Sequence, residues 1–268
     1  MNNQSREPYQ VQTPEPPPAP PQPDTSPQYL WTWRDVILIM GTAIALLFLG
    51  IALSTSLVPN FDPQNPDKAL DTVSFTINSF IVEFIALVGS VYFVGLRRKK
   101  LNWHIFGLQP LSTIWLWIAC GLGVIEYLLE TGVSQGIQYL LKIPDDAQIQ
   151  GMATQGLTWV NLVILVALAG LAIPFAEEIL FRGVIYTFIR ERWGIWVGII
   201  ASALLYALVS SFDIVAGSAA FVLGVVTAFA YERSKSLWAA VTVHVFSSML
   251  SLIVFYVLTL PGMHVPFS

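Results

Sequence analysis

The strongest constraint on this chain is a series of apolar stretches, each about as long as a membrane-spanning helix. They are Val36–Val58, Val73–Leu96, Thr113–Val133, Val160–Ala176, Ile195–Ser211, Ile214–Ala230 and Leu237–Leu260. A helix needs about 20 apolar residues, at about 1.5 Å per residue, to cross the hydrocarbon core of a bilayer. Only 11% of the 268 residues are charged and 55% are hydrophobic, which leaves too few charges to cover a water-facing surface. The sequence therefore predicts an all-α, polytopic membrane bundle of about seven transmembrane helices.

The predicted helices follow a segment of different composition. Residues 1–28 hold nine of the 17 prolines, and a segment that buries so little apolar surface is expected to be a disordered tail. Residues 29–109 contain the first two predicted helices and a basic loop, and residues 110–268 contain the others. Ile195–Ser211 and Ile214–Ala230 are expected to form a tight hairpin. The stretch at Val160–Ala176 is either one long helix that continues past Pro174 to about Arg190 or a broken helix.

Basic residues predict how the helices are oriented. If the N-terminus is cytoplasmic, ten Lys and Arg residues lie on that side: Arg6, Arg34, Arg97, Arg98, Lys99, Lys100, Arg190, Arg192, Arg233 and Lys235. Only Lys68 and Lys142 lie on the other side, and cytoplasmic loops of membrane proteins are enriched in positive charge. We therefore expect an integral, multi-pass protein with a cytoplasmic N-terminus. All nine tryptophans fall near predicted helix ends, which is typical of an aromatic belt in contact with membrane lipid.

Composition also limits the chemistry. The single cysteine, Cys120, excludes an intramolecular disulfide and Cys-rich zinc motifs, and a net charge of −4 offers no basic surface for nucleic acid. Of the three histidines, His104 lies in a predicted loop and His264 near the C-terminus, so only His244 lies within a predicted span. A metal or general-base site inside the membrane would have to combine His244 with carboxylates.

Five glutamates fall within the apolar stretches, where an ionisable group costs several kcal/mol. They are Glu83, Glu126, Glu130, Glu177 and Glu178. Glu126 and Glu130 are four residues apart and share one helix face. The sequence leaves open whether these two residues and Glu83 are structural or functional.

Glu177 and Glu178 stand out because a cation follows at helical spacing. Glu178 and Arg182 are four residues apart in the order that favours an ion pair. In one arrangement Arg182 neutralises Glu178, and Glu177 is free to face a cavity and transfer protons. In the other, a buried ion pair and a protonated glutamate only lock this helix to its neighbours.

The segment Glu177-Glu-Ile-Leu-Phe-Arg182-Gly183 fits an EExxxRG motif and resembles the CPBP family of intramembrane endopeptidases. This family includes CAAX prenyl proteases and the bacteriocin-processing (Abi) proteins, and the resemblance covers roughly residues 110–258. The family motif FxxxH falls on Tyr206 and Ser210, and HxxxN falls on His244 and Ser248. Serines therefore replace the second histidine and the asparagine.

The resemblance implies a peptide-bond hydrolase in which Glu177, Glu178, Arg182 and His244 form the catalytic set. Such an enzyme would activate water as a zinc protease or as a glutamate-dependent hydrolase. Catalytic zinc usually has three protein ligands, whereas Glu177 and His244 supply two, so zinc is only weakly supported.

Three functions follow as hypotheses. The first is an endopeptidase that acts on a membrane-associated protein or peptide, with activity impaired by Ser210 and Ser248. The second is an inactive family member that binds or helps to assemble a membrane protein. The third, a small transporter that uses Glu126, Glu130 and Glu177, is disfavoured because no internal repeat is visible.

Overall fold

The computed structural model describes residues 29–57, 73–143 and 158–259, and every regular element in these ranges is helical. The elements are α1 (Trp33–Leu57), α3 (Val73–Ser90), η1 (Val91–Arg97), η2 (Trp103–Phe106), α4 (Thr113–Leu141), α6 (Trp159–Ala167), η3 (Leu168–Ala172), α7 (Ile173–Glu178), η4 (Ile179–Tyr186), α8 (Thr187–Trp193), α9 (Ile195–Ser210), α10 (Ile214–Ser234) and α11 (Leu237–Thr259). The predicted Pro-rich tail and His264 lie outside the described residues.

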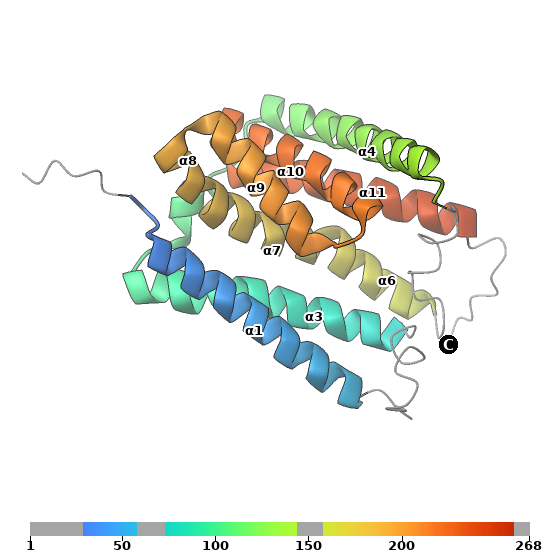
Figure 1. Cartoon of the computed structure of the whole chain (residues 1–268), viewed down its shortest axis with the longest axis horizontal. Coiled ribbons are helices and arrows are strands. Elements are labelled where there is room, and N and C mark those ends of the chain that lie inside the picture. The colour runs from blue at the N-terminus through green and yellow to red at the C-terminus, as the bar shows by residue number, and fades with distance from the viewer. Residues whose placement is uncertain (1–28, 58–72, 144–157, 260–268) are drawn as a thin grey trace, which may run out of the picture.

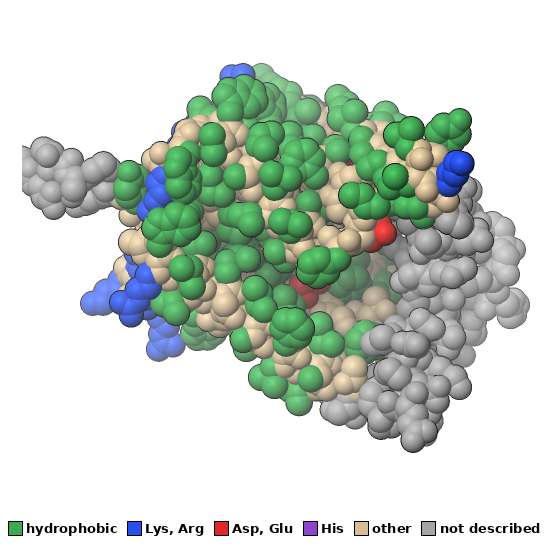
Figure 2. Space-filling model, viewed as in Figure 1, with side chains coloured by type: hydrophobic (Ala, Val, Ile, Leu, Met, Phe, Trp, Pro, Cys, Tyr) green, Lys and Arg blue, Asp and Glu red, His purple; other side chains and the backbone are tan. Residues whose placement is uncertain are grey.

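Within these ranges, six helices are long and apolar enough to cross a membrane, so the predicted polytopic helical bundle is confirmed. The remaining apolar helix, α9, has 16 residues and a length of about 24 Å, shorter than the hydrocarbon core. Apolar side chains cover most of the face seen in Figure 2, and most of the visible Lys and Arg side chains gather at one end of the bundle. This distribution suits a bundle that is surrounded by lipid.

The fourth predicted span is one continuous helix from Trp159 to Trp193. Of the two alternatives predicted for it, the structure has the long helix that continues past Pro174 to about Arg190, and not the broken one. Pro174 is accommodated because a π-helical turn, η3, comes directly before α7. Proline has no N–H and its ring clashes with the preceding turn, and a wider turn relieves both problems. A second π-helical segment, η4, follows directly after Glu178.

The long helix formed by α6, η3, α7, η4 and α8 runs through the middle of the bundle (Figure 1). Helices α1 and α3 pair on one side of it, and α4 packs against α10 and α11 on the other. Segment α7 contacts both α3 and α11, while η4 contacts α9, α10 and α11. All eight residues of η4 are buried, so this segment lies at the centre of the core.

Two glycines allow the central elements to approach each other closely. A Cβ atom on Gly183 would lie 2.5 Å from the ring of Phe106 in η2. A Cβ atom on Gly224 in α10 would lie 2.8 Å from the Cα of Ala203 in α9. Larger side chains at these positions would push the elements around Arg182 apart.

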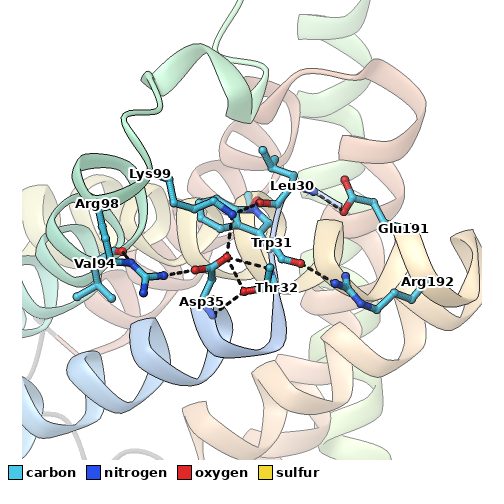
Figure 3. A network of polar contacts seen from close by, with 10 residues as sticks. Leu30, Trp31, Thr32, Asp35, Val94, Arg98, Lys99, Glu191 and Arg192 are labelled. Carbon is cyan, nitrogen blue, oxygen red and sulfur yellow. Dashed lines mark hydrogen bonds and ion pairs between the residues drawn. The ribbon is translucent and has the colours of Figure 1, made fainter. Parts of the chain in front are cut away.

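A polar network ties the start of α1 to the basic segment after η1 (Figure 3). Asp35 is 4% exposed and forms ion pairs with Arg98 and with Lys99, whose Nζ lies 2.8 Å from Oδ2. Lys99 also donates to the carbonyl oxygen of Leu30 at 2.6 Å. Part of the predicted basic loop therefore neutralises a buried carboxylate.

Trp31 does not belong to an aromatic belt, so that prediction is wrong for this residue. Its side chain is fully buried, and its indole N–H donates to the carbonyl oxygen of Gly183 at 3.0 Å. Arg192 in α8 donates to the carbonyl oxygen of Trp31 at 2.7 Å (Figure 3). Proximity to a helix end could not reveal this burial, because it depends on how η4 packs against the chain that enters α1.

Candidate active site

Four elements bring polar side chains together in the apolar interior. Glu177 and Glu178 come from α7, Arg182 from η4, Tyr206 from α9 and His244 from α11. Glu178, Arg182, Tyr206 and His244 are each less than 5% exposed, and 13% of the Glu177 side chain is accessible. These five residues, the polar cluster, include all four residues that the sequence predicts as a catalytic set.

Arg182 neutralises Glu178 and is held by the neighbouring helix. Its Nε lies 3.0 Å from Oε2 of Glu178, which is the ion pair expected from their spacing. Its Nη2 donates to the carbonyl oxygen of Gly224 at 3.1 Å and to the hydroxyl of Thr227. The guanidinium carbon lies 5.3 Å from the centre of the Tyr206 ring. Glu178 therefore belongs to a buried pair that also joins the central helix to α10.

The same carboxylate orients His244. Oε1 of Glu178 lies 2.9 Å from Nδ1 of His244. An ionised carboxylate can only accept, so Nδ1 carries the hydrogen, and Nε2 of a neutral ring is left as an acceptor. This assignment of the tautomer follows from the hydrogen-bond partners.

Nε2 of His244 faces Glu177. It lies 3.6 Å from Oε2 of Glu177, which is too long for a direct hydrogen bond. The Tyr206 hydroxyl donates to the same carboxylate oxygen at 3.1 Å. Two acceptors that face one point are suited to a water molecule, because water can donate one hydrogen to each of them.

The face of the molecule beside α3 and α9 is hollowed. Figure 2 shows a recess between α9 and the α1–α3 pair, with an acidic side chain in it. Glu83 on α3 lies close enough to Glu177 for their charges to interact. The recess therefore lies beside α3, whose Glu83 is near Glu177 but is not one of the five residues of the polar cluster.

The two serines that replace the expected motif residues lie at the edge of the polar cluster. Ser210 is the last residue of α9; it is exposed and interacts with the side chain of Tyr206, one turn before it. Ser248 is half-buried and lines a separate cavity that also contains Glu130. Neither serine shows a hydrogen bond to Glu177, Glu178 or His244 among the described residues.

Sequence reasoning missed three contributions to the polar cluster. Tyr206 was considered only as a replacement in a motif, whereas its hydroxyl contacts Glu177. Thr227 and the backbone of Gly224 in α10 bind Arg182, whereas the sequence predicts this segment only as a span and as one half of a hairpin. The hydroxyl groups of Tyr206 and Thr227, within two apolar spans, could have indicated buried polar contacts. Their partners could not be predicted, because these depend on which helices are adjacent.

The polar cluster does not fit a catalytic zinc ion. Glu177 and His244 face each other, but Glu178 is already paired with Arg182 and bonded to Nδ1 of the imidazole. No group of three His, Cys, Asp or Glu side chains in the described ranges is arranged to hold a metal ion. A usual catalytic zinc site needs three protein ligands, so we derive no step through zinc.

Comparison with known families points to the same part of the chain. Residues 159–250 match the family described as type II CAAX prenyl endopeptidase Rce1-like. This range is about a third of the 268 residues and contains the whole polar cluster. No curated protein and no solved structure matches the chain.

Proposed function

Because residues 159–250 form a domain of the Rce1-like family of CPBP and CAAX prenyl endopeptidases, we propose that this chain is an intramembrane endopeptidase. It would hydrolyse a peptide bond of a membrane-associated protein or peptide. The observation that supports this proposal is the approach of Oε2 of Glu177 to Nε2 of His244, 3.6 Å apart in a buried polar cluster.

In the proposed mechanism Glu177 is the general base. A water molecule between Oε2 of Glu177 and Nε2 of His244 would donate to both atoms, with an oxygen lone pair directed at the scissile carbonyl carbon. Glu177 takes one proton as the water oxygen bonds to that carbon. The C–N bond then breaks, and Glu177 returns the proton to the leaving amine, so the two products are a carboxylic acid and an amine.

Glu178 and Arg182 are positioning residues in this mechanism. Oε1 of Glu178 lies 2.9 Å from Nδ1 of His244, and Nε of Arg182 lies 3.0 Å from the other oxygen of the same carboxylate. A fixed Nδ1–H leaves Nε2 facing Glu177, much as a buried carboxylate orients histidine in serine proteases. His244 therefore orients the attacking water without having to change its own position.

Tyr206 is the donor nearest to the reacting atoms. Its hydroxyl lies 3.1 Å from Oε2 of Glu177 and could turn towards the oxygen that becomes negative in the transition state. A donor aimed at that oxygen contributes on the order of 10²–10³ in rate. Tyr206 would therefore supply part of the stabilisation that the family obtains from residues replaced here by serines.

The test compares the wild-type chain with Glu177→Gln, a variant that keeps the shape but cannot accept the proton. Each is expressed in cells without the endogenous protein, and new protein N-termini in the membrane fraction are identified by mass spectrometry. We expect N-termini that appear with the wild-type chain and are absent with Glu177→Gln. A matched Glu191→Gln variant, which lies outside the polar cluster and keeps an oxygen that can accept from the backbone N–H of Leu30, should retain the cleavage.

The second candidate function is that of an inactive family member that binds or helps to assemble a membrane protein. The observation that favours it is the closed network of Arg182, Glu178 and His244, which would stabilise the bundle without any turnover. In that case wild type and Glu177→Gln would yield the same N-termini and capture the same membrane partner. Cleavage gained by Ser210→His, next to Tyr206, would instead identify a hydrolase impaired at this position.

A further inference from the structure

A second polar region lies beyond His244, along the contact between α4 and α11. The backbones are close here, since a Cβ atom on Gly123 would lie 2.9 Å from the carbonyl oxygen of Val243. On α4, Glu126 and Glu130 lie three and seven residues after Gly123 and share its face. On α11, three serines occupy the corresponding turns: Ser247, Ser248 and Ser251.

Glu130 and the three serines line a cavity, which we call the α4–α11 cavity. Its volume is about 240 Å³, which is room for several water molecules. Four of its lining side chains carry oxygen: Glu130, Ser247, Ser248 and Ser251. The other three are Ala169, Leu223 and Leu252. A cavity with several hydroxyl and carboxyl groups provides the two to four polar partners that a buried water molecule needs.

Glu126 does not line the cavity itself, but it lies one helical turn before Glu130 and next to Ser247, both of which do. It is fully buried, and neither of its carboxyl oxygens has a hydrogen-bond partner among the described residues. The side chain of Ser247, which lines the cavity, is its polar neighbour. A buried carboxyl group without partners is strongly unfavourable, so water in the cavity is the simplest source of the missing hydrogen bonds.

One end of the cavity lies close to the polar cluster, although none of the five residues of that cluster lines it. Ser247 and Ser248 lie three and four residues after His244, so they stand one helical turn from the imidazole. Leu223, in the cavity wall, precedes Gly224, whose carbonyl oxygen binds Arg182.

The other end leads away from the basic residues. Ser251 lies about 21 Å along α11 from its start near Lys235, at 1.5 Å per residue. Buried Ser134 and Gln138 continue the polar face of α4 in the same direction. Polar side chains therefore extend from the polar cluster towards the end of the bundle that contains Lys142.

We propose that the α4–α11 cavity is a water-filled passage that supplies the polar cluster from the Lys142 end of the bundle. Its ligand is water, held by Glu130 and the three serines, with Glu126 beside them. The passage deepens the proposed function, because each hydrolysed peptide bond consumes one water molecule at a buried site. Substrate would use the recess beside α3 and α9, on the other side of the central helix. Hydration of the passage itself does not depend on catalysis, so the two proposals can fail separately.

The test is cysteine labelling in proteoliposomes with a charged, membrane-impermeant thiosulfonate, which reacts with a thiolate and therefore needs water. All variants carry Cys120→Ser. We expect Ser248→Cys and Ser251→Cys to react at least tenfold faster than Ile253→Cys, which is 57% exposed on the apolar surface at similar depth. Reaction should occur only from the side that also labels Lys142→Cys. Equal rates for Ser251→Cys and Ile253→Cys would overturn the proposal.

A second variant tests continuity. Ser251→Leu should lower the labelling of Ser248→Cys at least tenfold, whereas Ser251→Thr, which keeps the hydroxyl, should not. Undiminished labelling in Ser251→Leu would contradict a single passage. If Ser248→Cys and Ser251→Cys are labelled fast but the chain cleaves no protein, the passage is supported and the proposed protease function is wrong. If the chain cleaves its substrate but neither cysteine is labelled, the protease function is supported and the passage is wrong.

Discussion

At the scale of single residues, Glu178 organises the polar cluster by using both of its carboxyl oxygens. One oxygen pairs with Arg182 at 3.0 Å and the other contacts Nδ1 of His244 at 2.9 Å. Glu177, one residue earlier, points in another direction because adjacent residues on a helix are about 100° apart. Two neighbouring residues of the same type therefore have different partners and different proposed roles.

Arg182→Ala should destabilise the protein by about 3–5 kcal/mol, because it leaves Glu178 buried without its cation. Unfolding of the purified protein in mixed detergent and denaturant measures this loss. Arg233→Ala is the matched control. Arg233 is exposed and its guanidinium contacts the Phe229 ring, a contact that contributes about 0.5–1 kcal/mol. Equal losses in the two variants would mean that the buried ion pair does not stabilise the bundle.

Tyr206→Phe should lower the cleavage rate by about 10²-fold, because it removes the hydroxyl that contacts Glu177. Its stability should change by no more than about 1.5 kcal/mol, the usual range for one hydrogen bond. Rates are measured on a peptide identified by the Glu177→Gln comparison. An unchanged rate would leave Tyr206 as a packing residue against Phe181, whose ring centre is 4.9 Å away.

Treatment with a metal chelator should leave the cleavage rate within about twofold, because the polar cluster has only two free candidate ligands for a metal ion. The melting temperature should also remain unchanged, since no structural metal group was found in the described ranges. If the chelator abolished cleavage and added zinc restored it, Glu178 would have to leave Arg182 and act as the third zinc ligand beside Glu177 and His244.

At the scale of elements, the site depends on one long helix that widens into a π-helical segment twice. The π-helical segments η3 and η4 flank α7, and Glu178 stands at the junction with η4. Such segments within α-helices often occur at functional sites, because the extra residue redirects the side chains around it. Helices α9 and α10 then close over this segment through the approach of Gly224 to Ala203.

Gly224→Ala should destabilise the protein by about 1–3 kcal/mol, because its Cβ would lie 2.8 Å from the Cα of Ala203, where only backbone movement could relieve the clash. Gly121→Ala is the control, as a Cβ atom there meets nothing within 4 Å. That variant should stay within about 1 kcal/mol of the wild type. The same unfolding measurement compares the two variants. Equal changes in the free energy of unfolding would show that the close approach of α9 to α10 at Gly224 does not contribute to stability.

At the scale of the whole molecule, positive charge is concentrated at one end of the bundle (Figure 2). Some of it is used internally, since Arg98 and Lys99 pair with buried Asp35 and Arg192 binds the backbone of Trp31 (Figure 3). Basic residues at this end therefore hold the start of α1 and the residues before it in place. They also provide the charge asymmetry from which the orientation in the membrane is predicted.

A topology measurement tests that orientation. Reporters that are active only in the cytoplasm should be active when placed before Tyr29 or at Lys235, and inactive at Lys142 or in the turn at Asp213. The last position matters because α9 is shorter than the bilayer core, and it must still cross if seven passes are correct. Activity at Asp213 would show that α9 and α10 form a hairpin that does not cross.

The sequence by itself determined the class of this protein, the helical spans and the pairing of Glu178 with Arg182. These follow from local rules: apolar length predicts a span, and four-residue spacing places two side chains on one helix face. Only the tertiary structure decided that Glu178 also holds His244, that Tyr206 contacts Glu177, and that Trp31 is a core residue. Those contacts join elements separated by about 30 to 150 residues, and local periodicity carries no information about which helices become neighbours. Neighbours are chosen by how close two backbones can approach, and here Gly183 and Gly224 permit the approaches that bury the polar cluster.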